Sequence, residues 1–127
     1  MQDRCTYEFA IIRIVPKVER EEFFNVGAIL FSKRKKFLGM KFEINQSRLD
    51  AFSKELDINT LNTYLQAWKM VCEGERQGGA IGKMDLASRF RWLTASRSTI
   101  IQSSNTHPGL CLDPEKELAD LFQKYVL

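Results

Sequence analysis

The sequence predicts an α+β fold: a mainly antiparallel sheet with helices packed on at least one face. Three observations lead to this class. The first third of the chain has three apolar stretches that alternate like β-strands and are joined by short polar links. The apolar spacing then changes to the 3.6-residue period of helices, and a short late strand precedes a last helix. We expect residues 1–127 to form a single domain, because 127 residues suffice for one hydrophobic core.

The first predicted strand, Tyr7 to Val15, is apolar on both faces and stops at Pro16, as expected for a central strand. Arg13 is its exceptional residue. A half-buried guanidinium needs a partner, and a carboxylate on a neighbouring strand would provide one.

The second predicted strand, Glu22 to Ser32, contains Asn25 and Gly27, which are poor strand formers. Strict alternation places both on the face that also carries Ile29 and Phe31. We expect Gly27 to mark a bulge with positive φ, or to face a backbone too close for a Cβ.

A basic turn, Lys33 to Lys36, leads to a third strand, Phe37 to Ile44, with one wetter face, as expected nearer a sheet edge. The three strands form an antiparallel meander. The turn resembles a nuclear-import cluster, but a solvated hairpin turn explains the same residues.

Start and stop signals predict the helices. Ser47 caps a short helix, Asp57 caps a longer one that ends at Gly74, Asp85 begins a third, and Asp113-Pro114 begins the last. Gly78, Gly79 and Gly82 are assigned to a loop, Thr99 to Ser104 to a fourth strand, and His107 to Gly109 to a turn.

Composition excludes collagen, a coiled coil and a disordered tail. The chain has no apolar run long enough to span a membrane and no apolar signal core, so we expect a cytoplasmic protein without membrane contact. The net charge of +3 is too small to indicate a nucleic-acid binder. Arg89-Phe90-Arg91-Trp92 has the basic and aromatic mixture of such a site, but at helical spacing the arginines become a solvated edge, and nucleic acid is not the expected partner.

The three cysteines, Cys5, Cys72 and Cys111, form no CxxC pair, which indicates free thiols in a reducing compartment. With His107 they have the composition of a Cys3His zinc site, but not the close ligand pairs of a structural one. We therefore expect no metal and no cofactor, and Cys72 is interpreted as a small buried hydrophobe.

No catalytic residue is predicted, because the chain has none of the GxSxG, P-loop, GxGxxG or HExxH motifs. A nucleophilic pair would have to use the single histidine, His107, with a serine or cysteine, and its expected turn would align it poorly. Whether the protein is an enzyme stays open at this stage.

Polar residues in two separate stretches form the candidate ligand-binding set. They are Glu22, Asn25 and Gly27 on the second strand, and Arg97, Ser98 and Gln102 around the late strand. If the two strands are neighbours, these residues form a polar patch in which Arg97 suits a phosphate or carboxylate. The alternative is structural: Glu22 pairs with Arg97 or Arg13 and ties the sheet together.

The order of several segments resembles the bacterial domain-of-unknown-function 3037 family. These segments are Y-E-F-A-I-I-R-I-V-P, E-E-F-F-N-V-G-A-I-L-F, R-F-R-W-L and S-T-I-I-Q-S-S, and the resemblance runs from Tyr7 to about Val126. It implies a small bacterial protein with no assigned activity, associated with genes for HipA-like kinases. We therefore expect a cytoplasmic accessory protein that acts through a protein partner, with such a kinase as the candidate. The alternative is a binding or enzymatic protein for a phosphate-bearing ligand, held by the polar patch.

Overall fold

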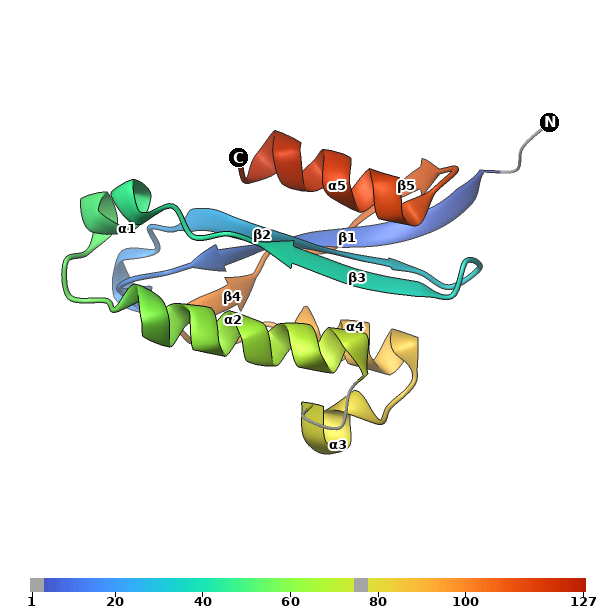
Figure 1. The fold of residues 1–127 in the computed structure, drawn as a ribbon, viewed down its shortest axis with the longest axis horizontal. Helices are drawn as coiled ribbons and strands as arrows, with labels where there is room; N and C mark the ends of the chain where they lie inside the picture. The colour runs from blue at the N-terminus through green and yellow to red at the C-terminus, as the bar shows by residue number, and fades with distance from the viewer. Residues whose placement is uncertain (1–3, 75–77) are drawn as a thin grey trace.

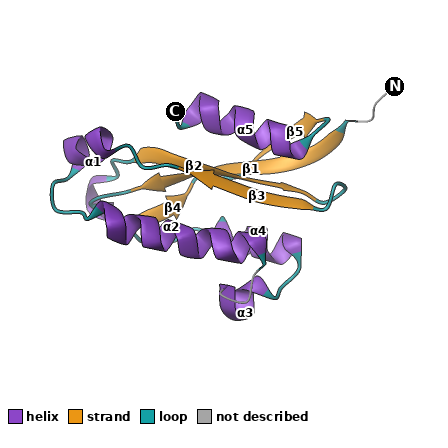
Figure 2. Cartoon of the chain, viewed as in Figure 1, coloured by secondary structure: helices purple, strands orange, loops and turns teal. Residues whose placement is uncertain are grey.

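A five-stranded antiparallel sheet lies between two layers of helices in the computed structural model, which describes residues 4–74 and 78–127 (Figure 1). The strands are β1 (Cys5–Ile14), β2 (Phe24–Ser32), β3 (Phe37–Phe42), β4 (Ile101–Ser103) and β5 (His107–Cys111). The helices are η1 (Val18–Arg20), α1 (Gln46–Phe52), α2 (Ile58–Glu73), α3 (Gly79–Gly82), α4 (Leu86–Leu93) and α5 (Pro114–Tyr125). Figure 2 shows α5 on one face of the sheet and α2 with α4 on the other, which confirms the α+β class.

Strand β1 is the centre of the sheet, as its two apolar faces predict. It pairs with β2 along one edge, and with both β4 and β5 along the other, while β3 extends the sheet beyond β2. Alternate side chains of β1 enter two separate cores. Cys5 and Tyr7 pack with α5, whereas Ile12 and Ile14 pack with α2 and α4.

A β-bulge in β2 changes which residues share a face. Ile12 pairs with Gly27 and Arg13 pairs with Asn25, so Val26 is an extra residue opposite β1. Val26 therefore packs in the same core as Ile29, and the prediction of strict alternation was wrong at this point.

Gly27 lies where β3 approaches most closely. A Cβ built on it would stand 2.8 Å from the carbonyl oxygen of Lys41 and 3.1 Å from the Cβ of Phe42. Its φ is not positive, so the close backbone approach explains this glycine and the predicted positive φ was wrong.

Three predicted helix caps are confirmed. Asp57, Asp85 and Asp113 each accept a hydrogen bond from a backbone N–H of the first turn. Gly74 ends α2 with φ +74°. The cap of helix α1 lies two residues before the predicted cap Ser47, because the Asn45 side chain accepts from the Arg48 N–H at 3.1 Å.

Two predicted loops are regular structure. Residues 107–109 belong to β5, where Gly109 pairs with Tyr7 and leaves room for its ring. Pairing along the free edge of β1 overrides the local turn signal of the Pro-Gly sequence. Gly79 to Gly82 form the short helix α3. Within the part of the chain that the structure describes, no helix is both long and apolar enough to cross a membrane.

Candidate functional site

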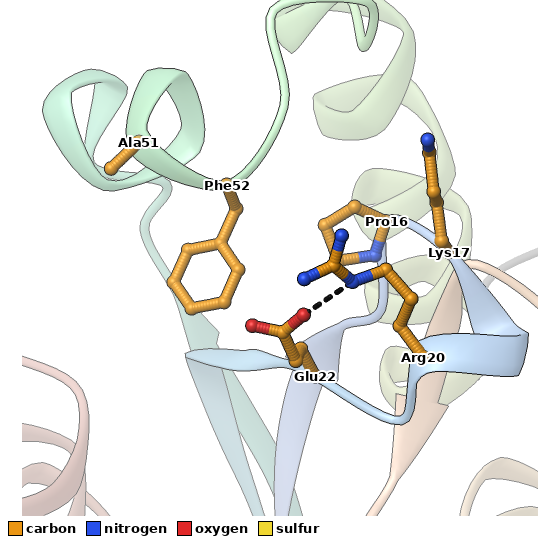
Figure 3. Close-up of a pocket in the computed structure, with 6 residues that line it drawn as sticks. All are labelled: Pro16, Lys17, Arg20, Glu22, Ala51 and Phe52. Atoms are coloured by element: carbon orange, nitrogen blue, oxygen red, sulfur yellow. Dashed lines mark hydrogen bonds and ion pairs between the residues drawn. The ribbon is translucent and has the colours of Figure 1, made fainter.

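The structure does not bring the predicted polar residues into one cleft. Glu22 lines a hollow of about 360 Å³ with Arg20 and Phe52, shown in Figure 3. Its carboxylate accepts from Arg20 Nε at 2.5 Å, and both side chains are more than half exposed. Glu22 thus pairs neither with Arg97 nor with Arg13, and the predicted ion pair across the sheet was wrong.

Asn25 and Gly27 also lie outside a shared site. The Asn25 amide donates to the carbonyl oxygen of Tyr125 at 3.1 Å, at the C-terminal end of α5. Gly27 faces the backbone of β3. Both residues are therefore explained by packing of the sheet against its neighbours.

The late predicted residues do come together. Arg97, Ser98 and Gln102 line a second hollow, of about 400 Å³, which Arg13 and Phe23 also line. Arg13 stands directly opposite Gln102 in the pairing of β1 with β4. Part of the predicted set therefore meets at one place, with Arg13 as an added member.

The polar side chains of the late strand mainly satisfy their own backbone. Thr99 Oγ1 donates to the carbonyl oxygen of Ile101, Gln102 Nε2 to that of Thr99, and Ser103 Oγ to that of Ser104. Strand β4 is an edge strand, and these bonds occupy carbonyl groups that an edge would otherwise leave open. Their presence in the sequence thus has a structural reason.

Arg13 has a different partner from the expected one. Its guanidinium carbon lies 4.0 Å from the centre of the Phe23 ring, and its Nε is buried without an acceptor. Among the described residues, no hydrogen bond or ion pair reaches the Arg13 guanidinium. The prediction of a carboxylate on a neighbouring strand was therefore wrong.

A larger, apolar hollow of about 620 Å³ lies between α2, α4 and the segment that leads into β4. We call it the aromatic groove, and define it by Tyr64, Trp68, Trp92, Arg97, Ile100 and Ile101. Tyr64 is 51% exposed and Trp92 39% exposed. The groove thus offers large aromatic surface to solvent.

Arg97 holds the two tryptophans of the groove in place. Its guanidinium carbon is 4.9 Å from the Trp68 ring centre and 4.8 Å from that of Trp92. It donates to the carbonyl oxygens of Trp92 and Leu93 at the end of α4, and burial lowers the pKa of this arginine. Arg97 therefore stiffens the wall of the groove, with part of its donor capacity already used.

Neither Trp68 nor Tyr64 is among the site residues that the sequence predicts. The two residues are four apart in α2 and therefore lie on the same side of the helix. Trp92 lies two positions after the buried Phe90 in α4. Residues two apart in a helix point to nearly opposite sides, so the Trp92 side chain faces outward. That spacing was the available signal for an aromatic surface.

Arg89 is buried, which corrects its prediction as a solvated edge. It is 9% exposed and donates from one nitrogen to the carbonyl oxygens of Val71 and Cys72, at 3.2 and 3.0 Å. Only Arg91 behaves as predicted: it is exposed and pairs with Glu8.

The cysteines and the histidine do not converge. Cys5 and Cys111 lie in one core with 3.8 Å between their sulfur atoms, whereas Cys72 lies in the other. Burial raises the pKa of both Cys72 and Cys111 to about 12. His107 is exposed on β5, and its ring packs against Phe9 of β1. Across residues 4–74 and 78–127, no three metal-ligating side chains cluster.

Fold and hollows together define a small α+β protein with an aromatic groove beside an arginine-lined hollow. Residues 9–126 match the model of the family described as protein of unknown function (DUF3037), and the chain belongs to that family. This confirms the resemblance noted in the sequence. The comparisons with curated proteins and with solved structures gave no match.

Proposed function

We propose that this protein is a cytoplasmic accessory protein that binds a protein partner, and that an apolar segment of the partner occupies the aromatic groove. The observation that carries the proposal is the exposure of Tyr64 and Trp92 beside the stacked pair of Trp68 and Arg97. Tryptophan and tyrosine are the side chains that most often dominate the binding energy of protein interfaces.

The chemistry of the groove favours an apolar protein segment over a nucleic acid. Arg97 is the only charged side chain among the described residues that line it, and two backbone carbonyls already accept hydrogen bonds from its guanidinium. A phosphate backbone would need several available cations along its path. The stacking on Arg97 also fixes the tryptophan rings, which lowers the entropy lost on binding.

The family association makes a HipA-like kinase the partner to test first. Three buried free thiols agree with a reducing compartment such as the cytoplasm. The kinase assignment itself comes from the resemblance and stays a prediction.

Affinity measurement with groove variants tests the proposal. A HipA-like kinase encoded beside this chain's gene is titrated into the protein and into its Tyr64→Ala and Trp92→Ala variants. Each substitution should weaken binding by about tenfold or more, as expected for an aromatic hot spot. Leu110→Ala is the control, since Leu110 is 57% exposed on β5. Equal affinities for all four proteins would show that the kinase does not use the groove, and no binding would remove the kinase as partner.

A further inference from the structure

The Arg13 guanidinium has no hydrogen-bond partner among the described residues. Arg13 is half-buried in the central strand, and its Nε has no acceptor. Taking a charged group partly out of water is unfavourable, and stacking on Phe23 offsets only part of that cost. The rest of its hydrogen-bonding capacity opens toward the hollow it shares with Ser98 and Gln102.

The charges around this hollow favour a carboxylate over a phosphate. Arg97 lines it too, but its guanidinium already donates to Trp92 and Leu93. Glu21 also lines the hollow and adds a negative charge. The hollow therefore presents one uncommitted guanidinium, which matches the two oxygens of one carboxylate. A phosphate dianion would be poorly neutralised there.

The hollow adjoins the aromatic groove. Arg97 lines both, and the residues that follow it divide between them: Ser98 and Gln102 face the hollow, whereas Ile100 and Ile101 face the groove. Arg13 and Gln102 lie on the α5 face of the sheet, whereas Ile101 and the groove lie on the α2 and α4 face, so a segment that passes round the edge strand β4 beside Arg97 could fill the groove and reach Arg13. Within a continuous segment, only the side chain of an aspartate or glutamate supplies a carboxylate.

We propose that Arg13 binds the carboxylate of an aspartate or glutamate side chain in the same partner segment whose apolar side chains occupy the aromatic groove. The inference rests on the proposed function and adds the chemistry of the partner: an apolar segment with a nearby acidic residue. Arg13 sets specificity, while the aromatic groove supplies most of the contact area.

Nuclear magnetic resonance on the full chain tests this with small probes. The probes are ω-phenylalkanoates of increasing length, from phenylacetate to 6-phenylhexanoate, each with its uncharged primary amide. The signals are the Nε–H of Arg13 and the indole N–H groups of Trp68 and Trp92. One member of the acid series should shift all three signals and bind about tenfold more tightly than its amide. The amide should shift only the indole signals. Arg13→Gln should abolish the preference for the acid, and Arg91→Gln, at an exposed arginine, should keep it.

Each other outcome has a distinct meaning. Equal binding of acid and amide, with the indole signals shifted, would overturn the role of Arg13 and leave the groove proposal standing. If neither the acids nor the amides shift the indole signals, the result contradicts the groove as a binding site. A shift of the Arg13 signal by inorganic phosphate at concentrations where no acid acts would overturn the carboxylate assignment in favour of a phosphate ligand. If Arg13→Gln does not fold, Arg13→Lys is the second variant. It keeps the positive charge but not the paired N–H donors of a guanidinium, and should lose most of the preference for the acid over its amide.

Discussion

Two arginines with a buried Nε, Arg89 and Arg13, have opposite surroundings. In each, that Nε has no acceptor. Arg89 donates to the carbonyl oxygens of Val71 and Cys72 at the end of α2, whereas the Arg13 guanidinium stacks on the ring of Phe23 and has no hydrogen-bond acceptor among the described residues. The difference separates an arginine that completes the fold from one that we propose binds a ligand.

The Arg89 arrangement recurs at other helix ends. Arg97 donates to the last carbonyls of α4, and Arg48 of α1 donates to the carbonyl oxygen of Val126 after α5. A cation at a helix C-terminus satisfies open carbonyls and opposes the negative end of the helix dipole. Arg13 is in a strand, and its side chain donates to no helix-end carbonyl among the described residues, so this structural explanation does not apply to it.

Replacing Arg89 should have the largest effect on stability. Arg89→Met leaves the buried carbonyls of Val71 and Cys72 without their donor, which should cost about 2–4 kcal/mol of the free energy of unfolding. Urea unfolding measures this as a lower midpoint at unchanged slope. Arg91→Met is the control and should cost at most about 1 kcal/mol, since its ion pair is exposed. Similar losses in both variants would contradict a structural role for Arg89.

Gly27→Ala tests the close packing of β2 against β3, next to Arg13 in the sheet. The added Cβ would collide with the carbonyl oxygen of Lys41, so β3 must shift, at a cost of about 1–3 kcal/mol. Thermal and urea unfolding should both show the loss. Thr6→Ala, at an exposed position in β1, is the matched strand control. Unchanged unfolding of Gly27→Ala would mean that β3 does not need the glycine, and ligand approach would become the better explanation.

Arg13→Met should change stability far less than Arg89→Met. It removes the stacking on Phe23, about 0.5–1 kcal/mol, and leaves no described acceptor unsatisfied. Urea midpoints of the two variants, measured side by side, give the contrast directly. If Arg13→Met unfolds as easily as Arg89→Met, then Arg13 is part of the structural framework and the distinction between the two arginines is wrong.

The smallest expected effect is the pH dependence of the α4 cap. A hydrogen bond from the Ser88 backbone N–H lowers the pKa of Asp85. The folded pKa is below the unfolded one, so the stabilisation by Asp85 is present above about pH 4 and is lost as the pH falls through the folded value. Stability curves of the parent and Asp85→Asn should thus differ near neutrality and converge in acid. A difference that stays constant down to strongly acidic pH would exclude the carboxylate as its source.

Much of the fold could be predicted because its signals are local. The meander and the caps Asp57, Asp85 and Asp113 follow from alternation and from side chains that bond the next turn. A bulge was one of the two explanations expected for Gly27, but the extra residue, Val26, could not be predicted, because pairing with β1 sets it. Strand β5 was missed for the same reason: the free edge of β1 decides its conformation, against the local turn signal.

The candidate site was predicted only in part. Arg97, Ser98 and Gln102 share a hollow because they are close in the chain. Glu22 and Asn25 find other partners, which depend on where Arg20 and the end of α5 lie. The spacing of Phe90 and Trp92 indicated an exposed aromatic residue on α4, but the groove also needs α2 and the segment before β4, and their packing could not be predicted from the sequence.

The central claim is that a partner occupies the aromatic groove, and the two tryptophans of the chain, Trp68 and Trp92, allow a direct measurement. Protein that carries 5-fluorotryptophan should show two fluorine resonances, and both report on this groove. On addition of unlabelled HipA-like kinase, we expect both resonances to shift or broaden, and Tyr64→Ala to weaken the response. A stable complex with the kinase in which both resonances stay unchanged would contradict the claim, because the partner would then bind elsewhere.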